Sequence, residues 1–202
     1  DFIKKAGMAA AAVTLLPEGS LFAKGTDEKV RAVMIGVGLR GQNHLELLLR
    51  RDDVEIIAIC DIDERMLTSS KEIITKSGKK MPQVFTGDLY AWKKMLELKN
   101  IDTVIIATPW EWHKEMIIGS LEAGIKYVGT EVMIGITLQD HWDVVKAAEK
   151  YNAHVCMLEN VCYRRDVMAV LNMVRQNVFG ELVHLQGGYQ HDLREVKFNN
   201  GI

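Results

Sequence analysis

From Val30 onward, short apolar runs alternate with longer segments whose apolar residues recur at helical spacing. Short runs rich in Val and Ile predict strands buried on both faces, and the longer segments predict amphipathic helices. The predicted strands are 30–38, 54–61, 83–86, 102–109, 126–132 and 153–160. The predicted helices between them are 42–51, 63–78, 88–98, 113–124 and 137–151.

Local signals mark several ends of these helices. Gly78 and Gly124 are predicted helix stops, and Thr137 with Asp140 three residues later predicts a capping box. Strands that alternate with helices imply right-handed crossovers and a parallel sheet. We therefore predict an α/β fold with a doubly wound parallel sheet over residues 28–158.

The pattern changes after residue 158. Residues 163–177 predict a helix with one apolar face, formed by Val167, Val170, Leu171 and Val174. Residues 180–192 predict a long strand with alternating positions Val183, Leu185, Gly187, Tyr189 and His191 on one side. These elements would begin a second, α+β domain with an open sheet over residues 159–202. Because a lone strand cannot bury its apolar face, we expect this domain to be truncated.

Residues 1–25 differ in character from the rest of the chain. Two lysines precede an Ala-rich apolar run, which is followed by Pro17 and small residues. This pattern resembles an export signal, and "DFIKK" fits the second half of a twin-arginine motif whose arginines would precede residue 1. We expect an exported, periplasmic protein; the alternative is a short amphipathic N-terminal helix.

Charge and cysteine content narrow the function classes. The formal net charge of -2 gives no electrostatic reason to expect nucleic acid or an anionic membrane as a partner. The three cysteines show no CxxC spacing, and those in apolar runs, Cys60 and Cys156, are expected to be buried thiols. No metal site is predicted, and the expected partner is a small molecule.

A glycine motif carries the first functional signal. Gly36, Gly38 and Gly41 form G-x-G-x-x-G between a predicted strand and a predicted helix, and Asp61 ends the next strand 20 residues beyond Gly41. This context indicates a dinucleotide-binding Rossmann domain, with the pyrophosphate at the helix N-terminus and the ribose hydroxyls on Asp61. A carboxylate there would repel a 2′-phosphate and favours NAD over NADP. The alternative is a glycine-rich turn in an unliganded α/β domain.

Further candidates follow the carboxyl ends of the other strands, where open α/β sheets bind ligands. Trp110 and Trp112 would stack on a nicotinamide or a sugar, or else cover the hydrophobic core. His113 would form a hydrogen bond with a ribose, or else have a purely structural role. Proton-capable groups stand near the domain junction, where substrates bind in two-domain proteins. The candidates at these places are Thr108, Pro109, Glu131, Asn160, Tyr163, Tyr189 and His191.

Several stretches together resemble a known family. They are "VMIGVGLRG", "CDID", "ATPWEWH", "TEV" and "LENVCYRRDVMAVLNMVRQNVFGELVHLQGGYQHDLR". Over residues 30–202 the chain is similar to the glucose–fructose oxidoreductase and inositol dehydrogenase (Gfo/Idh/MocA) superfamily. Within it, the sequence resembles the NAD-dependent glycosidases of glycoside hydrolase family 109, the α-N-acetylgalactosaminidase group. "ATPWEWH", "LENVCYRRDVM" and "GGYQHDLR" are the specific parts of the match.

The resemblance implies a catalytic use of tightly held NAD. The sugar 3-hydroxyl is oxidised to a ketone, the acidified C2 proton leaves with the glycosidic group, water adds and the hydride returns. The net reaction is retaining hydrolysis, outside the two-carboxylate scheme. By similarity, Tyr189 would contact the sugar, and Tyr163 and His191 are candidates for proton transfer. The implied NAD contacts are Arg40, Gly41, Asp61, Glu111, Trp112, His113, Lys114, Glu131, Val132 and Asn160.

Two departures bear on the reaction. Dehydrogenases of the superfamily usually carry Glu-Lys-Pro where this chain has Glu131-Val132-Met133, and the glycosidases usually have a small residue in place of Met133. The absent lysine favours redox-assisted hydrolysis over net oxidation. The catalytic His of the family would lie downstream of residue 202. A sugar oxidoreductase and a non-catalytic nucleotide-binding fragment stay open as alternatives, as does a homo-oligomer formed through the sheet domain.

Overall fold

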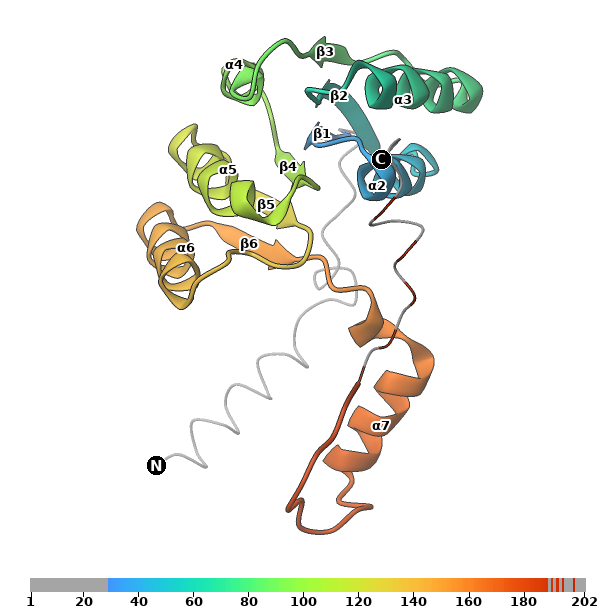
Figure 1. Ribbon diagram of the computed structural model, residues 1–202, viewed down its shortest axis with the longest axis vertical. Helices are drawn as coiled ribbons and strands as arrows, with labels where there is room; N and C mark the ends of the chain where they lie inside the picture. Colours follow the sequence, from blue (N-terminus) through green and yellow to red (C-terminus); the bar gives the residue numbers. More distant parts are fainter. Residues whose placement is uncertain (1–28, 189, 191, 193, 195–197, 199–202) are drawn as a thin grey trace, which may run out of the picture. The chain divides into compact units, whose positions relative to one another are not determined.

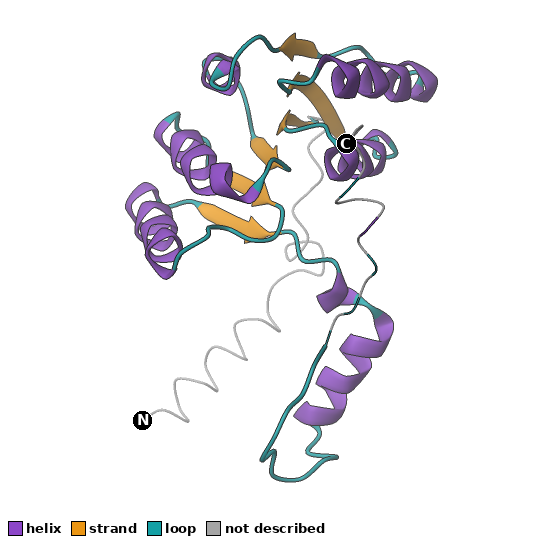
Figure 2. Cartoon of the chain, in the orientation of Figure 1, coloured by secondary structure: helices purple, strands orange, loops and turns teal. Residues whose placement is uncertain are grey.

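The computed structural model describes residues 29–188 together with residues 190, 192, 194 and 198. The chain divides into two compact units, Asp1–Leu158 and Glu159–Ile202. In the first unit, strands and helices alternate along the sequence (Figure 2). Among the described residues, no helix combines the length and apolar character that crossing a membrane requires.

The first unit is built on one parallel sheet (Figure 1). Its strands lie in the order β3-β2-β1-β4-β5-β6, and each pairs in parallel with its neighbours. This order confirms the predicted doubly wound sheet, and it places a topological switch point between β1 and β4. The strands are β1 (Val30–Ile35), β2 (Val54–Cys60), β3 (Gln83–Phe85), β4 (Thr103–Ile106), β5 (Tyr127–Thr130) and β6 (His154–Met157).

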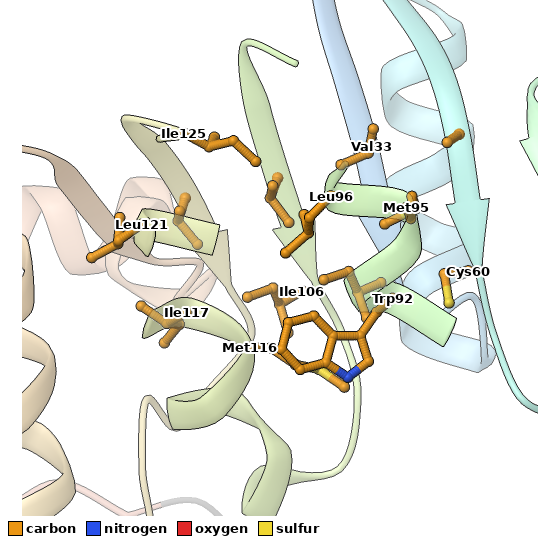
Figure 3. Packing of buried hydrophobic residues seen from close by; sticks show 14 of the residues in the cluster. Val33, Cys60, Trp92, Met95, Leu96, Ile106, Met116, Ile117, Leu121 and Ile125 are labelled. Carbon is orange, nitrogen blue, oxygen red and sulfur yellow. The ribbon is translucent and has the colours of Figure 1, made fainter. Parts of the chain in front are cut away.

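Helices cover both faces of this sheet. On one face lie α2 (Leu39–Leu49) and α3 (Glu64–Ser77); on the other lie α4 (Ala91–Leu96), α5 (Trp110–Glu122) and α6 (Leu138–Tyr151) (Figure 1). Strand β1 shows why both layers are needed. Val33 and Ile35 belong to the core under α4, α5 and α6, whereas Met34 belongs to the core under α2 and α3 (Figure 3 shows the first of these).

Several element boundaries differ from the predicted ones. Strand β4 ends at Ile106, three residues before the predicted end, and α5 begins at Trp110 and not at residue 113. Pro109 explains both shifts, because it has no N–H for the sheet ladder and its fixed φ suits the N-cap position that it occupies. His113 consequently lies within the helix, one turn from its start.

The predicted capping box at the start of α6 is confirmed. The Thr137 hydroxyl accepts a hydrogen bond from the Asp140 N–H at 3.1 Å, and the Asp140 carboxylate accepts one from the Thr137 N–H at 2.9 Å. Lys114 on α5 donates to the same carboxylate at 2.6 Å. Asp140 thus caps α6 and ties it to α5.

The second unit contains a short 3₁₀ helix, η1 (Val161–Tyr163), and α7 (Arg165–Arg175). The predicted helix over 163–177 is therefore present in shorter form. The predicted strand over 180–192 is wrong for its described part, because residues 180–188 form no strand. Alternating apolar residues form a strand only where a neighbouring strand receives their backbone hydrogen bonds, and the described residues include none for this segment.

The cysteines differ in their surroundings. Cys60 is buried, as predicted, but Cys156 and Cys162 are exposed, so the prediction for Cys156 is wrong. Cys156 lies on β6, which is the last strand in the sheet order and, among the described residues, has β5 as its one neighbouring strand. Among the described residues, no group of three or more His, Cys, Asp or Glu side chains is placed to hold a metal ion.

Candidate functional site: a dinucleotide cavity at the carboxyl ends of the strands

Two glycines of the motif are required by the fold itself. Gly36 has φ +86°, and a Cβ atom there would lie 2.6 Å from the Ala107 carbonyl oxygen. A Cβ atom at Gly41 would lie 2.2 Å from the Gly36 carbonyl oxygen. These contacts bring α2 against the turn that leaves β1, with its N-terminus directed over the carboxyl edge of the sheet.

Gly38 is different, because none of the described residues requires a glycine there. Its φ of -67° and ψ of -164° are open to other residues, and a Cβ atom would meet no described atom within 4 Å. Gly38 is the N-cap of α2, and no described side chain caps this helix start. The N–H groups of the first turn therefore lack a side-chain cap, and the space at Gly38 is open, which is the arrangement that lets a phosphate approach the backbone.

Asp61 stands opposite this helix start, at the end of β2. Its Oδ2 accepts a hydrogen bond from the Val37 N–H at 2.7 Å, and its Oδ1 accepts one from the Asp63 N–H at 2.9 Å. A carboxylate has about four acceptor positions, so two remain for a ligand. Asp61 is thereby fixed beside the glycine turn in an orientation that can accept ribose hydroxyls.

A cavity of about 260 Å³ joins these elements. It contains six of the predicted cofactor residues, and its walls are mainly apolar. Asp61 and Asp88 are its charged residues, and no Lys or Arg belongs to the described lining, so the electrostatics disfavour an added 2′-phosphate. The lining residues are Ile35, Gly36, Gly38, Cys60, Asp61, Ile62, Met66, Asp88, Leu89, Trp92, Ala107, Thr108, Pro109, Trp112 and Met116.

The cavity lining includes the thiol of Cys60, and its surroundings keep this thiol unreactive. Burial raises the pKa of the Cys60 thiol to about 12, with further contributions from the negative charges of Asp61 and Asp88. The thiol is therefore protonated at neutral pH, whereas thiol nucleophiles react as thiolates. Cys60 fills the wall and takes no part in chemistry.

Trp92 contributes an unsatisfied polar atom to the same wall. The side chain is 2% exposed, and its Nε1–H has no hydrogen-bond partner among the described residues. Gly119 on α5 sets the position of the indole, because a Cβ atom there would lie 2.7 Å from the ring. Figure 3 shows the Trp92 indole among the buried residues of the core under α4, α5 and α6, to which Met116 and Ile117 also belong. An unpaired buried donor costs about 1–3 kcal/mol, and the described residues supply no partner for this one.

Glu131 follows β5 and is linked to α2. Its Oε1 accepts a hydrogen bond from Arg40 Nε at 2.7 Å and lies 2.6 Å from His44 Nε2. Burial acts to raise the pKa of Glu131, but the hydrogen bonds from His44 and Arg40 outweigh it and hold the pKa below its ordinary value of 4.5. Glu131 is therefore ionised at neutral pH, where it is a poor proton donor and a weak base.

Other predicted cofactor residues lie outside the cavity lining. His113 is fully buried, with Nε2 at 2.8 Å from the Thr108 carbonyl oxygen and Nδ1 at 2.5 Å from that of Met133. Its ring joins the turn after β4 to the loop after β5. Lys114 forms an ion pair with Asp140 on α6, and this pairing raises the pKa of Lys114. Glu111 is exposed on the first turn of α5. The predicted NAD contacts of these residues and of Val132 stay predictions.

The remaining candidates belong to the second unit. Asn160 immediately precedes η1, and Tyr163 ends it with 76% of its surface exposed. Tyr189 and His191 lie outside the described residues. The NAD contact of Asn160, the sugar contact of Tyr189 and the proton-transfer roles of Tyr163 and His191 stay predictions.

Sequence reasoning missed three residues of this region. Asp88 follows the predicted strand 83–86, so the rule that identified Asp61 applied to it as well. His44 stands four residues after Arg40, a spacing that places both on one helix face. Trp92 had no such signal, because its position depends on a contact with Gly119 across two helices.

The glycine geometry predicts separate effects of two substitutions. We expect Gly38→Ala to change the free energy of unfolding by no more than about 1 kcal/mol while weakening NAD binding at least about tenfold, because its methyl group would fill the phosphate approach. Gly36→Ala is expected to destabilise the fold by more than about 2 kcal/mol through strain at positive φ. Urea denaturation and calorimetric titration with NAD measure both quantities. Unchanged NAD affinity in Gly38→Ala would contradict the assignment of this space to a phosphate.

The Glu131 contacts predict a pH-dependent contribution to stability. Because the folded-state pKa is lowered, the stabilisation is present above pH 4.5 and is lost as the pH falls through the lowered pKa. We expect Glu131→Gln to lose roughly 1–2 kcal/mol of unfolding free energy at pH 7, and this deficit to be smaller at a pH well below 4.5, where Glu131 becomes protonated. Urea denaturation across this range tests the expectation. A deficit that is equal at both pH values would show that the charge of Glu131 is not responsible.

Comparison with protein families identifies two segments of the chain. The model of the oxidoreductase family with an NAD-binding Rossmann fold (Gfo/Idh/MocA) matches residues 30–159, and the model of the glycosyl hydrolase 109 C-terminal domain matches residues 163–202.

A glycosyl hydrolase family 109 protein of Stenotrophomonas maltophilia is 56% identical over 198 residues, which are 97% of this chain and 43% of that protein. An alpha-N-acetylgalactosaminidase of Tannerella forsythia is 46% identical over 177 residues, 88% of this chain and 38% of that enzyme. The chain spans about two fifths of the length of these relatives.

Solved structures agree on the fold. A WlbA dehydrogenase from Chromobacterium violaceum, in complex with NADH and UDP-GlcNAcA, is 27% identical with a TM-score of 0.67, and the match covers 79% of this chain and 43% of that one. The myo-inositol 2-dehydrogenase of Lactobacillus plantarum is 23% identical with a TM-score of 0.65, covering 77% of this chain and 44% of that one. At the lower identity the likeness concerns the fold alone.

Proposed function

The chain belongs to the Gfo/Idh/MocA oxidoreductase family, whose NAD-binding Rossmann fold spans residues 30–159, and we propose that it is part of an NAD-dependent glycosidase. NAD is the cofactor of this domain. The observation that carries the glycosidase proposal is the match of residues 163–202 to the glycosyl hydrolase 109 C-terminal domain, next to 46% identity with an alpha-N-acetylgalactosaminidase. The proposed substrate is an N-acetylgalactosaminide-like sugar.

The residues of the cavity fit this cofactor. The open space before Gly38 and the free N–H groups of α2 would receive the pyrophosphate, and the fixed carboxylate of Asp61 would accept the ribose hydroxyls. When bound, NAD supplies a reversible hydride acceptor. The lack of a basic residue in the described lining supports NAD over NADP.

The proposed reaction uses that hydride acceptor transiently. A base removes the proton of the sugar 3-hydroxyl while C3 loses its hydrogen as hydride, which leaves a ketone at C3. The ketone acidifies the C2 proton; when a base removes it, the glycosidic C1–O bond breaks and the oxygen takes up a proton and leaves as the alcohol. Water then adds its hydroxyl to C1 of the alkene and a proton returns to C2. Finally the hydride returns to C3 and a proton returns to the C3 oxygen. The sum is hydrolysis, with no net change in the cofactor.

The proton acceptor for this reaction is not supplied by the loop after β5. Glu131 is held ionised by Arg40 and His44, and its lowered pKa makes it a weak base. Val132 carries no amine where dehydrogenases of the superfamily have a lysine. We therefore assign proton transfer to groups of the second unit, with Tyr163 and His191 as the candidates and Tyr189 as the sugar contact.

The second candidate function is an NAD-dependent sugar dehydrogenase. The structural neighbours favour it, because the Chromobacterium violaceum and Lactobacillus plantarum proteins are dehydrogenases. This alternative requires another base in place of the missing lysine. It also predicts net conversion of NAD to NADH, whereas the glycosidase reaction leaves the cofactor unchanged.

One assay separates the two functions. The protein in its full natural length is incubated with an aryl α-N-acetylgalactosaminide and no added NAD, and aryl alcohol release and absorbance at the NADH wavelength are followed together. We expect repeated turnover with no lasting NADH signal. Stoichiometric NADH accumulation with a free sugar, without aryl alcohol release from the glycoside, would contradict the glycosidase proposal and support the dehydrogenase.

A further inference from the structure

Two adjacent residues of α5, His113 and Lys114, have no part yet in the proposed function. The family resemblance implies that both contact NAD, but neither belongs to the described lining of the cavity. Each makes a contact that leads instead to the β5–α6 loop, residues 131–137, either directly or through the first turn of α6. This loop carries Glu131 and Val132, which are themselves predicted cofactor contacts.

His113 acts on the middle of the β5–α6 loop. The ring is fully buried, and its Nδ1 atom lies 2.5 Å from the Met133 carbonyl oxygen. Its Nε2 atom lies 2.8 Å from the carbonyl oxygen of Thr108, which belongs to the cavity wall. The ring therefore spans the distance between the wall and the loop, and close packing leaves a buried side chain held at two points little freedom to move.

Lys114 acts on the end of the loop through Asp140. Its Nζ atom lies 2.6 Å from Asp140 Oδ1, and Asp140 Oδ2 accepts the N–H groups of Ile136 at 3.2 Å and of Thr137 at 2.9 Å. The loop also packs directly on this residue, because a Cβ atom at Gly135 would lie 2.4 Å from the Asp140 Cβ atom. An amine that holds one oxygen of the carboxylate thus orients the other toward the loop.

The charges around Lys114 argue against a direct contact with a phosphate. Its ammonium group lies 2.6 Å from the carboxylate of Asp140 and 3.7 Å from that of Asp143, so two negative charges face one positive charge. The hydrogen bond with Asp140 raises the pKa of Lys114, and the same bond is the main reason that the pKa of Asp140 lies well below its usual range. Both groups are therefore charged at neutral pH, and the lysine is already paired.

We propose that His113 and Lys114 are positioning residues that hold the β5–α6 loop, His113 at the Met133 carbonyl and Lys114 through Asp140. The inference rests on the proposed NAD site, because it assigns these residues to a loop that carries predicted cofactor contacts. With Glu131 held by α2 at the other end, the loop is fixed before any ligand binds, and a preorganised loop lowers the ordering cost of binding. Direct contact of Lys114 with NAD is the competing explanation.

A double-mutant cycle separates the two explanations. Lys114→Met, Asp140→Asn and the double variant of the full-length protein are compared by hydrogen exchange of the loop amides without NAD and by calorimetric titration with NAD. The amide oxygen of Asn can still accept the loop N–H groups, but it lacks the charge that Lys114 pairs with. We expect each single variant to speed exchange at Ile136 and Thr137 and to weaken NAD binding, both by about two- to fivefold, as is typical of a partly exposed ion pair. The double variant is expected to be no worse than Asp140→Asn alone.

Additive effects would overturn this assignment. If Lys114 bound NAD itself, the affinity losses of the two single variants would multiply in the double variant, and Lys114→Met would leave exchange of the NAD-free loop unchanged. Lys79→Met is the matched control, because it removes a lysine of similar exposure from its 2.8 Å ion pair with Asp52 at the amino ends of the strands. It is expected to leave both loop exchange and NAD affinity unchanged, which separates loop positioning from a general loss of stability.

His113 is tested by a pair of variants. His113→Gln keeps an N–H donor for a carbonyl oxygen, whereas His113→Leu fills the space without one. We expect exchange of the loop amides to rise in His113→Leu and to rise less in His113→Gln. An equal rise in both would show that packing alone holds the loop there, and it would overturn the assignment for His113. Because Lys114 is partly exposed, its cycle decides the proposal even where a His113 variant fails to fold.

The exchange measurements distinguish this inference from the cofactor assignment beneath it, because they need no NAD. A protein that shows the expected exchange but binds no NAD would contradict the proposed function and support the loop assignment. A protein that binds NAD but shows unchanged exchange in Lys114→Met would overturn the loop assignment alone.

Discussion

The close contact between Gly41 and Gly36 positions the rest of the site. A Cβ atom at Gly41 would lie 2.2 Å from the Gly36 carbonyl oxygen, so α2 can pack against the turn after β1 only because Gly41 lacks a side chain. That packing directs the free N–H groups of α2 over the carboxyl ends of the strands. It also places Val37 where Asp61 accepts its N–H, and it brings Arg40 and His44 to Glu131. One steric constraint thereby fixes the Gly38 and Asp61 side of the cavity and the link from α2 to Glu131.

The acidic residues Glu131, Asp61 and Asp88 have different roles because their hydrogen-bond partners differ. Glu131 receives hydrogen bonds from Arg40 and His44, and they hold it ionised as a link between β5 and α2. Asp61 and Asp88 bind backbone N–H groups and keep acceptor positions directed at the cavity. The loop after β5 therefore contributes the fixed negative charge of Glu131. Under the proposed function, Tyr163 and His191 are the candidates for proton transfer.

Much of the first unit followed from its sequence. Val/Ile runs alternating with amphipathic segments predicted all six strands, and the glycine motif with Asp61 predicted the cavity at their carboxyl ends. These features depend on local patterns and on one topological rule. The pairing of Trp92 with Gly119 and the two carbonyl contacts of His113 depend on side chains that meet only after folding, and no local pattern encodes them. The strand predicted over 180–192 was wrong for residues 180–188, its continuously described part, because alternation alone supplies no neighbouring strand. The predicted roles of Tyr189 and His191 lie outside the described residues.

We propose that this cavity accepts a dinucleotide whose ribose hydroxyls are free and whose phosphate approaches the backbone at Gly38. Calorimetric titration with NAD and with NADP under one salt condition measures the preference between the two. We expect NAD to bind at least about tenfold more tightly, because Asp61 and Asp88 repel the 2′-phosphate and the described lining holds no Lys or Arg to neutralise it. Equal or tighter binding of NADP would show that the cavity does not select the free ribose hydroxyls.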